Sequence, residues 1–359
     1  MVGFEGTEIS PSLASLLARI QPAGVILFAR NIESLEQTWR LLKACRERVT
    51  APLFTSVDLE GGTVDRFRKV IGPTPSAASV FGSGNRKLFR KHGQLIGQAC
   101  RGFGFNLDFV PVLDLAFSAS RAVMSSRAVS ADPRQVTLYG RQFLAGLQAA
   151  GVIGAGKHFP GLGEANLDTH HELPSVKKSL QKMWEEDLYP YRALRGQLPL
   201  VLVGHASYTA LRGHHSPASL SGGWIGEILK NKIGYRGLVV SDDLEMGGVL
   251  KAAPIEEAAL AHIEAGGDLC LICRQQELVE RAYARLMEAA ERDPKFRARA
   301  LQSARRVMAF KAGSRAVRKK FSPPGPNLNA RLARALWNFS EEVEFGTIQF
   351  RSGARQAQS

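Results

Sequence analysis

The sequence has few cysteines and no long apolar segment, and its acidic residues are too few to balance its basic ones. Four cysteines in 359 residues are too few for a disulfide scaffold. No stretch approaches the roughly 20 consecutive apolar residues that span a bilayer. Residues 1–10 show no basic segment followed by an apolar one, so we expect no secretory signal and a cytoplasmic location. With 45% hydrophobic and 22% charged residues, the composition excludes fibrous and wholly disordered classes.

The basic excess is concentrated late in the chain. Lys and Arg number 47 against 33 Asp and Glu, which gives a net charge of +14 and raises nucleic acid as a partner. Eleven of the basic residues lie between Arg292 and Lys320, against one acid, Asp293. No zinc-finger pattern or aromatic-rich RNA-binding signature accompanies them. This pattern favours a solvated basic helix face over a patch for an anionic polymer or membrane surface, and we expect no specific nucleic-acid partner.

Cys270 and Cys273 have the spacing of a redox or metal motif. They lie in an apolar run typical of a buried strand, where residues i and i+3 face opposite ways, so the two sulfurs would diverge. No second pair at this spacing completes a zinc site. We therefore expect buried structural cysteines.

Short apolar runs alternate with segments of helical periodicity. The runs that predict strands are Val2–Glu5, Gly24–Phe28, Leu53–Asp58, Leu107–Val112, Val152–His158, Leu200–His205, Leu238–Asp242 and Asp268–Ile272. The segments that predict helices are Leu35–Arg48, Lys87–Arg101, Pro133–Ala150, Leu180–Leu194, Gly222–Asn231, Ile255–Ala265 and Gln275–Arg292. Apolar strands separated by helices are typical of a parallel sheet covered by helices. Eight of them favour an α/β fold, a single (β/α)8 TIM-type barrel.

The alternation weakens after about Arg315. We expect the barrel domain to span residues 1–315 and a basic helical C-terminal extension to span residues 316–359, with one further helix over Ala330–Asn338 and a frayed tail from Arg351.

Most of the predicted strands end in polar or ionisable residues, which are Arg30, Asp58, Asp114, Lys157, His158, His205, Asp242 and Asp243. The carboxyl ends of barrel strands are where catalytic groups sit in this architecture. The sequence therefore predicts an active site at that rim.

Six motifs occur in a fixed order, at Gly3–Gly6, Gly24–Asn31, Val57–Arg66, Asn106–Asp114, Lys157–Pro174 and Ser241–Met246. Together they resemble the family 3 glycoside hydrolases, and most of all their single-domain bacterial branch, the β-N-acetylglucosaminidases of cell-wall recycling. The resemblance runs to about residue 275. Leu162 and Glu164 stand where that branch usually has histidine and aspartate, which affects the hydrogen bonding of their loop.

The resemblance implies the catalytic residues. Asp242 would be the nucleophile that forms a covalent glycosyl-enzyme, so that configuration is retained. His170 would be the acid/base, oriented by Asp168. The residues alone leave other roles open, because Asp242 could cap a helix and Asp168 and His170 could belong to a capped loop.

The resemblance also implies a sugar-binding shell. Asp58 would accept from hydroxyls remote from the reacting carbon, with Arg66, Arg127, Lys157 and His158 around the ring. Surface salt bridges are the alternative for the two arginines. Neighbours on a regular strand face opposite ways, so Lys157 and His158 enter one pocket only if the backbone is distorted. We therefore predict a strained or cis peptide near this pair.

The implied function is a retaining β-N-acetylglucosaminidase that removes terminal, non-reducing, β-1,4-linked GlcNAc from muropeptides (GlcNAc-anhydro-MurNAc-peptides) in peptidoglycan recycling. Such an enzyme needs no metal and no organic cofactor, and we expect a monomer. Three alternatives remain open, which are a phosphorylase with the same dyad, a β-glucosidase, and a non-enzymatic protein that binds anionic polymers on an inactive barrel.

Overall fold

The computed structural model describes residues 1–165, 173–211, 216–319 and 321–356, without the side chains of residues 351 and 353–356. Its core is a curled parallel sheet of seven strands. In sheet order they are β1 (Gly24–Leu27), β2 (Phe54–Val57), β5 (Leu107–Asp108), β6 (Ile153–Phe159), β8 (Leu200–Val203), β10 (Leu238–Asp243) and β11 (Leu269–Leu271). The predicted parallel α/β fold is therefore confirmed.

The two edges of the sheet meet at residue 2. Val2 forms parallel bridges both to Val25 of β1 and to Ile272, one residue beyond β11. The segment Val2–Glu5, predicted as a strand, thus contributes a bridge between the edges instead of a strand of its own. Apolar side chains that alternate along the strands, such as Ile26, Phe54 and Leu107, fill the inside of the curled sheet.

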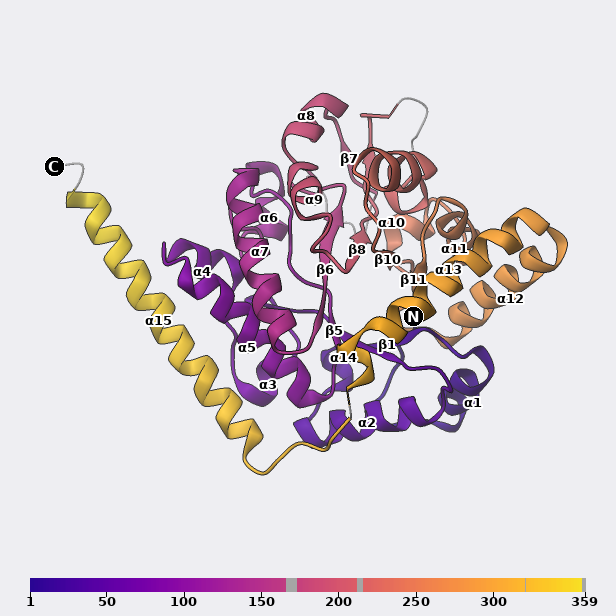
Figure 1. The fold of residues 1–359 in the computed structure, drawn as a ribbon, viewed down its shortest axis with the longest axis horizontal. Coiled ribbons are helices and arrows are strands. Elements are labelled where there is room, and N and C mark those ends of the chain that lie inside the picture. Colours follow the sequence, from indigo (N-terminus) through magenta and orange to yellow (C-terminus); the bar gives the residue numbers. More distant parts are fainter. Residues whose placement is uncertain (166–172, 212–215, 320, 357–359) are drawn as a thin grey trace.

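Helices cover the outside of the sheet (Figure 1). The main ones are α2 (Leu35–Glu47), α5 (Lys87–Phe103), α7 (Pro133–Ala149), α11 (Ile255–Glu264) and α12 (Gln276–Arg292). The prediction of one helix over Leu180–Leu194 is wrong, because the chain forms α8 (Leu180–Glu185) and α9 (Tyr189–Leu194). Glu186 between them has φ −109° and ψ −90°, which is not a helical conformation.

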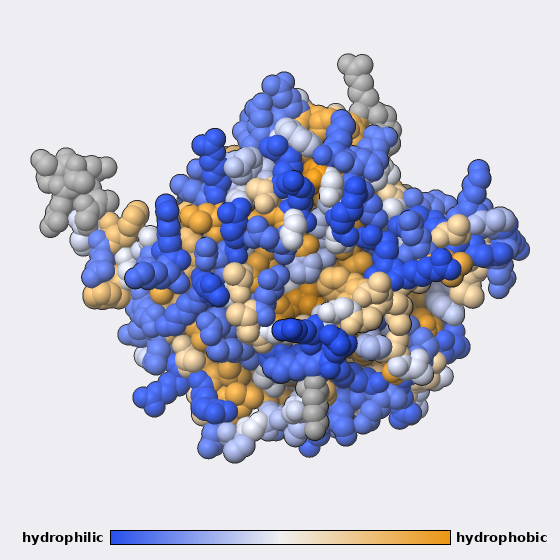
Figure 2. Space-filling model, viewed as in Figure 1, coloured by the Kyte–Doolittle hydropathy of each residue, from blue (hydrophilic) through white to orange (hydrophobic). Residues whose placement is uncertain are grey.

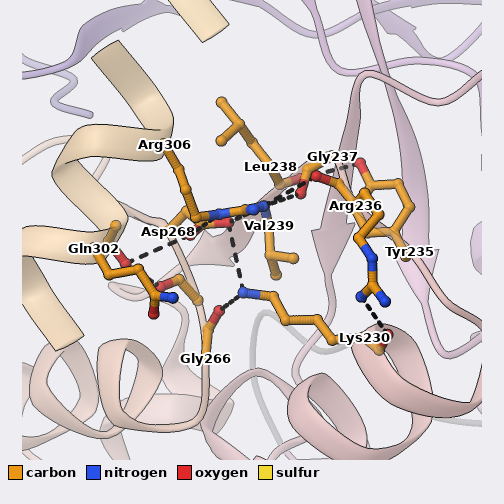
Figure 3. Close-up of polar contacts among 12 residues, drawn as sticks. Lys230, Tyr235, Arg236, Gly237, Leu238, Val239, Gly266, Asp268, Gln302 and Arg306 are labelled. Carbon is orange, nitrogen blue, oxygen red and sulfur yellow. Dashed lines mark hydrogen bonds and ion pairs between the residues drawn. The ribbon is translucent and has the colours of Figure 1, made fainter. Parts of the chain in front are cut away.

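Helix α13 (Pro294–Gly313) closes the end of the sheet where the strands begin, and its Val307 packs among the side chains inside the sheet. Figure 3 shows how it is anchored: Arg306 reaches Asp268, which also faces Lys230. Arg299 lies 3.7 Å from the same carboxylate. The prediction of a solvated basic face is therefore wrong for these two arginines of α13, which bind a fully buried aspartate side chain.

The final helix, α15 (Leu328–Gln356), packs along the outside against α3 (Arg68–Ile71), α4 (Ala77–Gly82) and α5. The predictions of a helix ending at Asn338 and a tail from Arg351 are wrong. Apolar residues continue at helical spacing, and the buried ones are Leu332, Leu336, Phe339 and Val343. On the face drawn in Figure 2, hydrophilic residues predominate and hydrophobic ones form separate patches. None of the described helices is both long and apolar enough to cross a bilayer.

Candidate active site

A pocket opens at the edge where the strands of the sheet end. Its charged and titratable lining residues are Asp58, Glu60, Arg66, Arg127, Lys157, His158, Asp242 and Asp243. Six of the eight predicted site residues therefore share one pocket. The other two, Asp168 and His170, lie outside the described residues.

Asp242 stands near the end of β10, and its Oδ1 accepts a hydrogen bond of 2.9 Å from the N–H of Asp243. Burial alone would raise the pKa of this carboxyl. The imidazoles of His158 and His205, together with the Asp243 N–H and Lys157, hold the pKa of Asp242 below its ordinary value. Its alternative role as a helix cap is wrong, because the next helix, α10 (Gly247–Leu250), begins after Met246 and no side chain caps it.

The residues behind Asp242 form a buried support. His205 Nε2 lies 2.9 Å from the carbonyl oxygen of Asp243, and its Nδ1 lies 2.7 Å from Ser219 Oγ. Burial raises the pKa of Asp243 to about 7, although the hydrogen bond that its carboxylate accepts from the N–H of Glu245 lowers this pKa. Two adjacent carboxyls therefore differ in charge at neutral pH, with Asp242 ionised and Asp243 partly protonated.

Lys157 and His158 both line the pocket, and the peptide bond between them is cis. The prediction of a strained or cis peptide near this pair is confirmed. The Lys157 ammonium lies 2.8 Å from Asp58 Oδ1 and 2.6 Å from Glu60 Oε1. Burial would lower the pKa of Lys157, but the two carboxylates hold it above its ordinary value.

Glu60 connects Lys157 with Arg127. The arginine donates to both carboxylate oxygens of Glu60, at 2.7 Å from Nε and 2.8 Å from Nη2. The two cations hold the pKa of Glu60 far below its ordinary value, although burial opposes this. The turn that follows needs glycine, since Gly61 has φ +82° and a Cβ there would overlap the carbonyl oxygen of Pro75.

Asp114 fixes the orientation of His158. Its Oδ2 lies 2.6 Å from His158 Nδ1, and its Oδ1 accepts from the N–H of Leu162 at 2.7 Å. Because the carboxylate accepts at Nδ1, the other ring nitrogen is directed toward Arg127, whose Nη2 lies 3.3 Å away. Asp114 thereby connects the end of β6 with the loop that follows it.

The two arginines differ in their surroundings. Arg127 is 13% exposed and binds a carboxylate that is 3% exposed, so its interpretation as part of a surface salt bridge is wrong. Arg66 is 28% exposed, lies 4.0 Å from Asp58 and faces the Phe28 ring at 5.3 Å. It lines the pocket nearer to solvent.

The sequence analysis placed Asp114 at the predicted rim but gave it no role in the site, and it did not name Glu60, although both residues lie in the six motifs. Cys273 also lines the pocket, whereas Cys270 donates from Sγ to the carbonyl oxygen of Ala259 on α11. The predicted divergence of the two sulfurs is confirmed, with Cys273 buried, Cys270 half-buried and both thiols free.

The arrangement suits a neutral polyhydroxylated ligand. Cations and carboxylates alternate around the pocket, so donors and acceptors lie side by side, as a ring of hydroxyl groups requires. Within the ranges that the structure describes, no three His, Cys, Asp or Glu side chains converge to hold a metal ion. An ionised carboxylate at the rim of a barrel-like parallel sheet, among groups that can bind sugar hydroxyls, is the kind of site at which a glycoside hydrolase acts.

Residues 2–310 match the model described as the glycosyl hydrolase family 3 N terminal domain. The chain belongs to glycosyl hydrolase family 3.

Relatives and solved structures agree with this assignment. The beta-hexosaminidase of Alkalilimnicola ehrlichii is 38% identical over 286 residues, 78% of this chain and 81% of that protein. The beta-hexosaminidase of Pseudomonas aeruginosa is 36% identical over 290 residues, 80% of this chain and 85% of that protein. The structure of a family 3 beta-N-acetylglucosaminidase from a Paenibacillus species superposes with a TM-score of 0.87 at 28% identity, over 96% of this chain and 67% of that one.

Proposed function

We propose that this chain is a retaining β-N-acetylglucosaminidase that removes terminal, non-reducing, β-1,4-linked GlcNAc. The observation that carries this proposal is the position of Asp242, an ionised carboxylate in a pocket that it shares with Asp58, Glu60 and Lys157. The printed names of the relatives, beta-hexosaminidase and beta-N-acetylglucosaminidase, support the choice of sugar.

In the first step an Oδ of Asp242 bonds to the anomeric carbon as the glycosidic C–O bond breaks, and the leaving oxygen takes a proton from His170. In the second step water attacks the same carbon, gives a proton to His170 and releases Asp242. The depressed pKa of Asp242 supports the first role, since a nucleophilic carboxylate must be ionised. Asp168 would orient the His170 ring in both steps.

The remaining pocket residues would hold the sugar. Among the described residues, Asp58 accepts one hydrogen bond from Lys157 and lies 4.0 Å from Arg66, so its oxygens have lone pairs that can accept from a sugar hydroxyl. Lys157 and Arg127 supply donors in the same pocket, each held by a carboxylate. The His158 ring, bonded to Asp114 through Nδ1 and facing Arg127 with Nε2, would line the sugar space. Pre-oriented groups of this kind bind a ring without reorganising.

For the substrate we propose muropeptides in peptidoglycan recycling, because their terminal sugar fits the relatives' names and their peptides carry acids that a +14 chain attracts. The catalytic unit would end near residue 315, which agrees with the match over residues 2–310.

Turnover of a panel of chromogenic β-glycosides, with and without phosphate, tests the proposal. We expect the GlcNAc glycoside to be preferred, free GlcNAc to be the product in both buffers, and Asp242→Ala and His170→Ala to lose at least about 100-fold in kcat. GlcNAc-1-phosphate as the product would indicate a phosphorylase instead. A preference for glucosides, or near wild-type turnover in either variant, would contradict the proposal.

A further inference from the structure

A groove lies at the end of the barrel opposite to the active site. Its lining includes Ala23 and Ala51, which precede β1 and β2, and one face of α13. Active-site residues such as Asp58 stand instead where the strands end. The groove has a volume of about 320 Å³, within the ~300–1,000 Å³ of small-molecule sites.

The sequence of α13 leaves this groove open. Ala300, Ala304, Val307 and Lys311 line it at spacings of four, three and four residues, so they share one helix face. The two alanines leave space that larger side chains would fill. Over these residues the helix rises about 16 Å, so the groove offers an elongated apolar wall that ends at Lys311.

Lys311 is the unusual group in this wall. Its side chain is 1% exposed, and its Nζ lies 5.0 Å from the centroid of the Phe54 ring. Across the parts of the chain that the structure describes, it has no hydrogen-bond acceptor and no carboxylate partner. Burial lowers its pKa to about 8. A buried ammonium without an anion is costly for a folded protein.

The polar and charged residues near the groove do not provide an ion-pair partner for the Lys311 ammonium. Asp268, the acidic residue in the lining, is bound by Arg306 and faces Lys230 (Figure 3). Arg299 lies 3.7 Å from the same carboxylate. Ser303 donates its hydroxyl to the carbonyl oxygen of Gly267. Among the described residues that line the groove, Lys311 is therefore a cation without a carboxylate partner, beside an apolar wall.

We infer that this groove binds an aliphatic monocarboxylate, with the hydrocarbon chain along Ala300 and Ala304 and the carboxylate on the Lys311 ammonium. A single negative charge matches the one ammonium among the described residues that line the groove. A phosphate dianion would bring a second charge into apolar surroundings, and a neutral alcohol would leave the ammonium unpaired.

Calorimetric titration with dodecanoate at neutral pH tests the inference on the full chain. We expect wild-type protein to bind dodecanoate more tightly than dodecanol or dodecyl phosphate. Lys311→Met keeps an unbranched side chain, one atom shorter, and removes its charge, so dodecanoate should bind about 10- to 100-fold more weakly while dodecanol is unaffected. Lys295→Met, at an exposed position of the same helix, is the matched control.

A second variant, Ala304→Phe, should fill the groove and abolish binding of all three compounds. Both groove variants should keep wild-type turnover of a GlcNAc glycoside, because the active site lies at the other end of the sheet. The binding readout does not depend on the proposed hydrolase activity. No binding of dodecanoate at about 1 mM, equal affinity of wild type for dodecanoate and dodecanol, tighter binding of dodecyl phosphate, or an unchanged affinity in Lys311→Met would each overturn the inference.

Discussion

The ammonium of Lys157 lies 2.6 Å from Oε1 of Glu60, and each of these side chains is 3% exposed. The same carboxylate takes two hydrogen bonds from Arg127. Glu60 therefore binds two pocket cations at once, and we expect it to act as a positioning residue.

Glu60→Gln keeps the shape of the side chain and removes its charge. We expect KM for a GlcNAc glycoside to rise more than kcat falls, because Lys157 and Arg127 lose their common anchor. Stability should fall by about 3 kcal/mol, since the buried Arg127 loses its carboxylate partner and Lys157 keeps only Asp58. Steady-state kinetics and denaturant unfolding measure both effects.

The matched control is Glu47→Gln, which removes one partner of an exposed pair with Lys43 on α2 and should change stability by less than about 0.5 kcal/mol. A Glu60→Gln enzyme with wild-type KM and stability would exclude the positioning role.

Asp114 and His158 should be energetically coupled. The Asp114 carboxylate, which has no exposed surface, accepts from the His158 ring at 2.6 Å. A double-mutant cycle with Asp114→Asn and His158→Gln should show a coupling free energy of about 1–2 kcal/mol in unfolding experiments. Effects that add within about 0.3 kcal/mol would show that this contact does not contribute to stability.

Asp243 should make stability depend on pH in a defined direction. Burial raises its pKa to about 7 from an unfolded value of 3.8. Between these values the folded carboxyl keeps a proton that the unfolded one has lost, so its contribution to stability is greatest below about pH 4 and is lost as the pH rises to about 7. Asp243→Asn removes this dependence.

The measurement is the free energy of unfolding of wild type and Asp243→Asn at about pH 5 and about pH 8. The free energy of unfolding of Asp243→Asn, relative to that of wild type, should be larger at the higher pH than at the lower one. Burial also raises the pKa of Asp187, to about 6, but this group is common to both proteins and cancels. A difference that does not change with pH would contradict the assignment.

The arginines of α13 should divide into anchors and exposed residues. Arg306 binds the buried Asp268, whereas the adjacent Arg305 is exposed. We expect Arg306→Met to cost about 1–2 kcal/mol of stability and Arg305→Met less than about 0.5 kcal/mol. Equal losses in denaturant unfolding would show that the ion pair with Asp268 does not hold the helix.

The fold was largely predictable because its strands are short apolar runs between helices of clear periodicity. The prediction of a strand at Val2–Glu5 was not met. This segment is apolar enough for a strand, but its strand pairing stops after the two bridges at Val2. The role of Arg306 could not be predicted, because its partner Asp268 is 38 residues away in sequence. The spacing of basic residues along α13 does not indicate which of them will contact a buried acidic side chain.

The site was predictable where a motif ends a strand, as for Asp58, Lys157, His158 and Asp242. Glu60 was missed because its function depends on the turn at Gly61, which directs the carboxylate toward Arg127, a residue 67 positions later. Neither local sequence indicates that Glu60 and Arg127 lie close together in the folded chain. The predictions for Asp168 and His170 fall outside the described residues.

The central claim is that Asp242 attacks the anomeric carbon. A GlcNAc fluoride with a second fluorine at C5 carries a good leaving group and slows hydrolysis of the glycosyl-enzyme, so that the sugar stays on the nucleophile. After digestion, mass spectrometry should find one fluorinated sugar on the peptide that contains Asp242, and none on the corresponding peptide of Asp242→Asn. A stable adduct on another carboxylate, such as Asp243 or Asp58, would contradict the account.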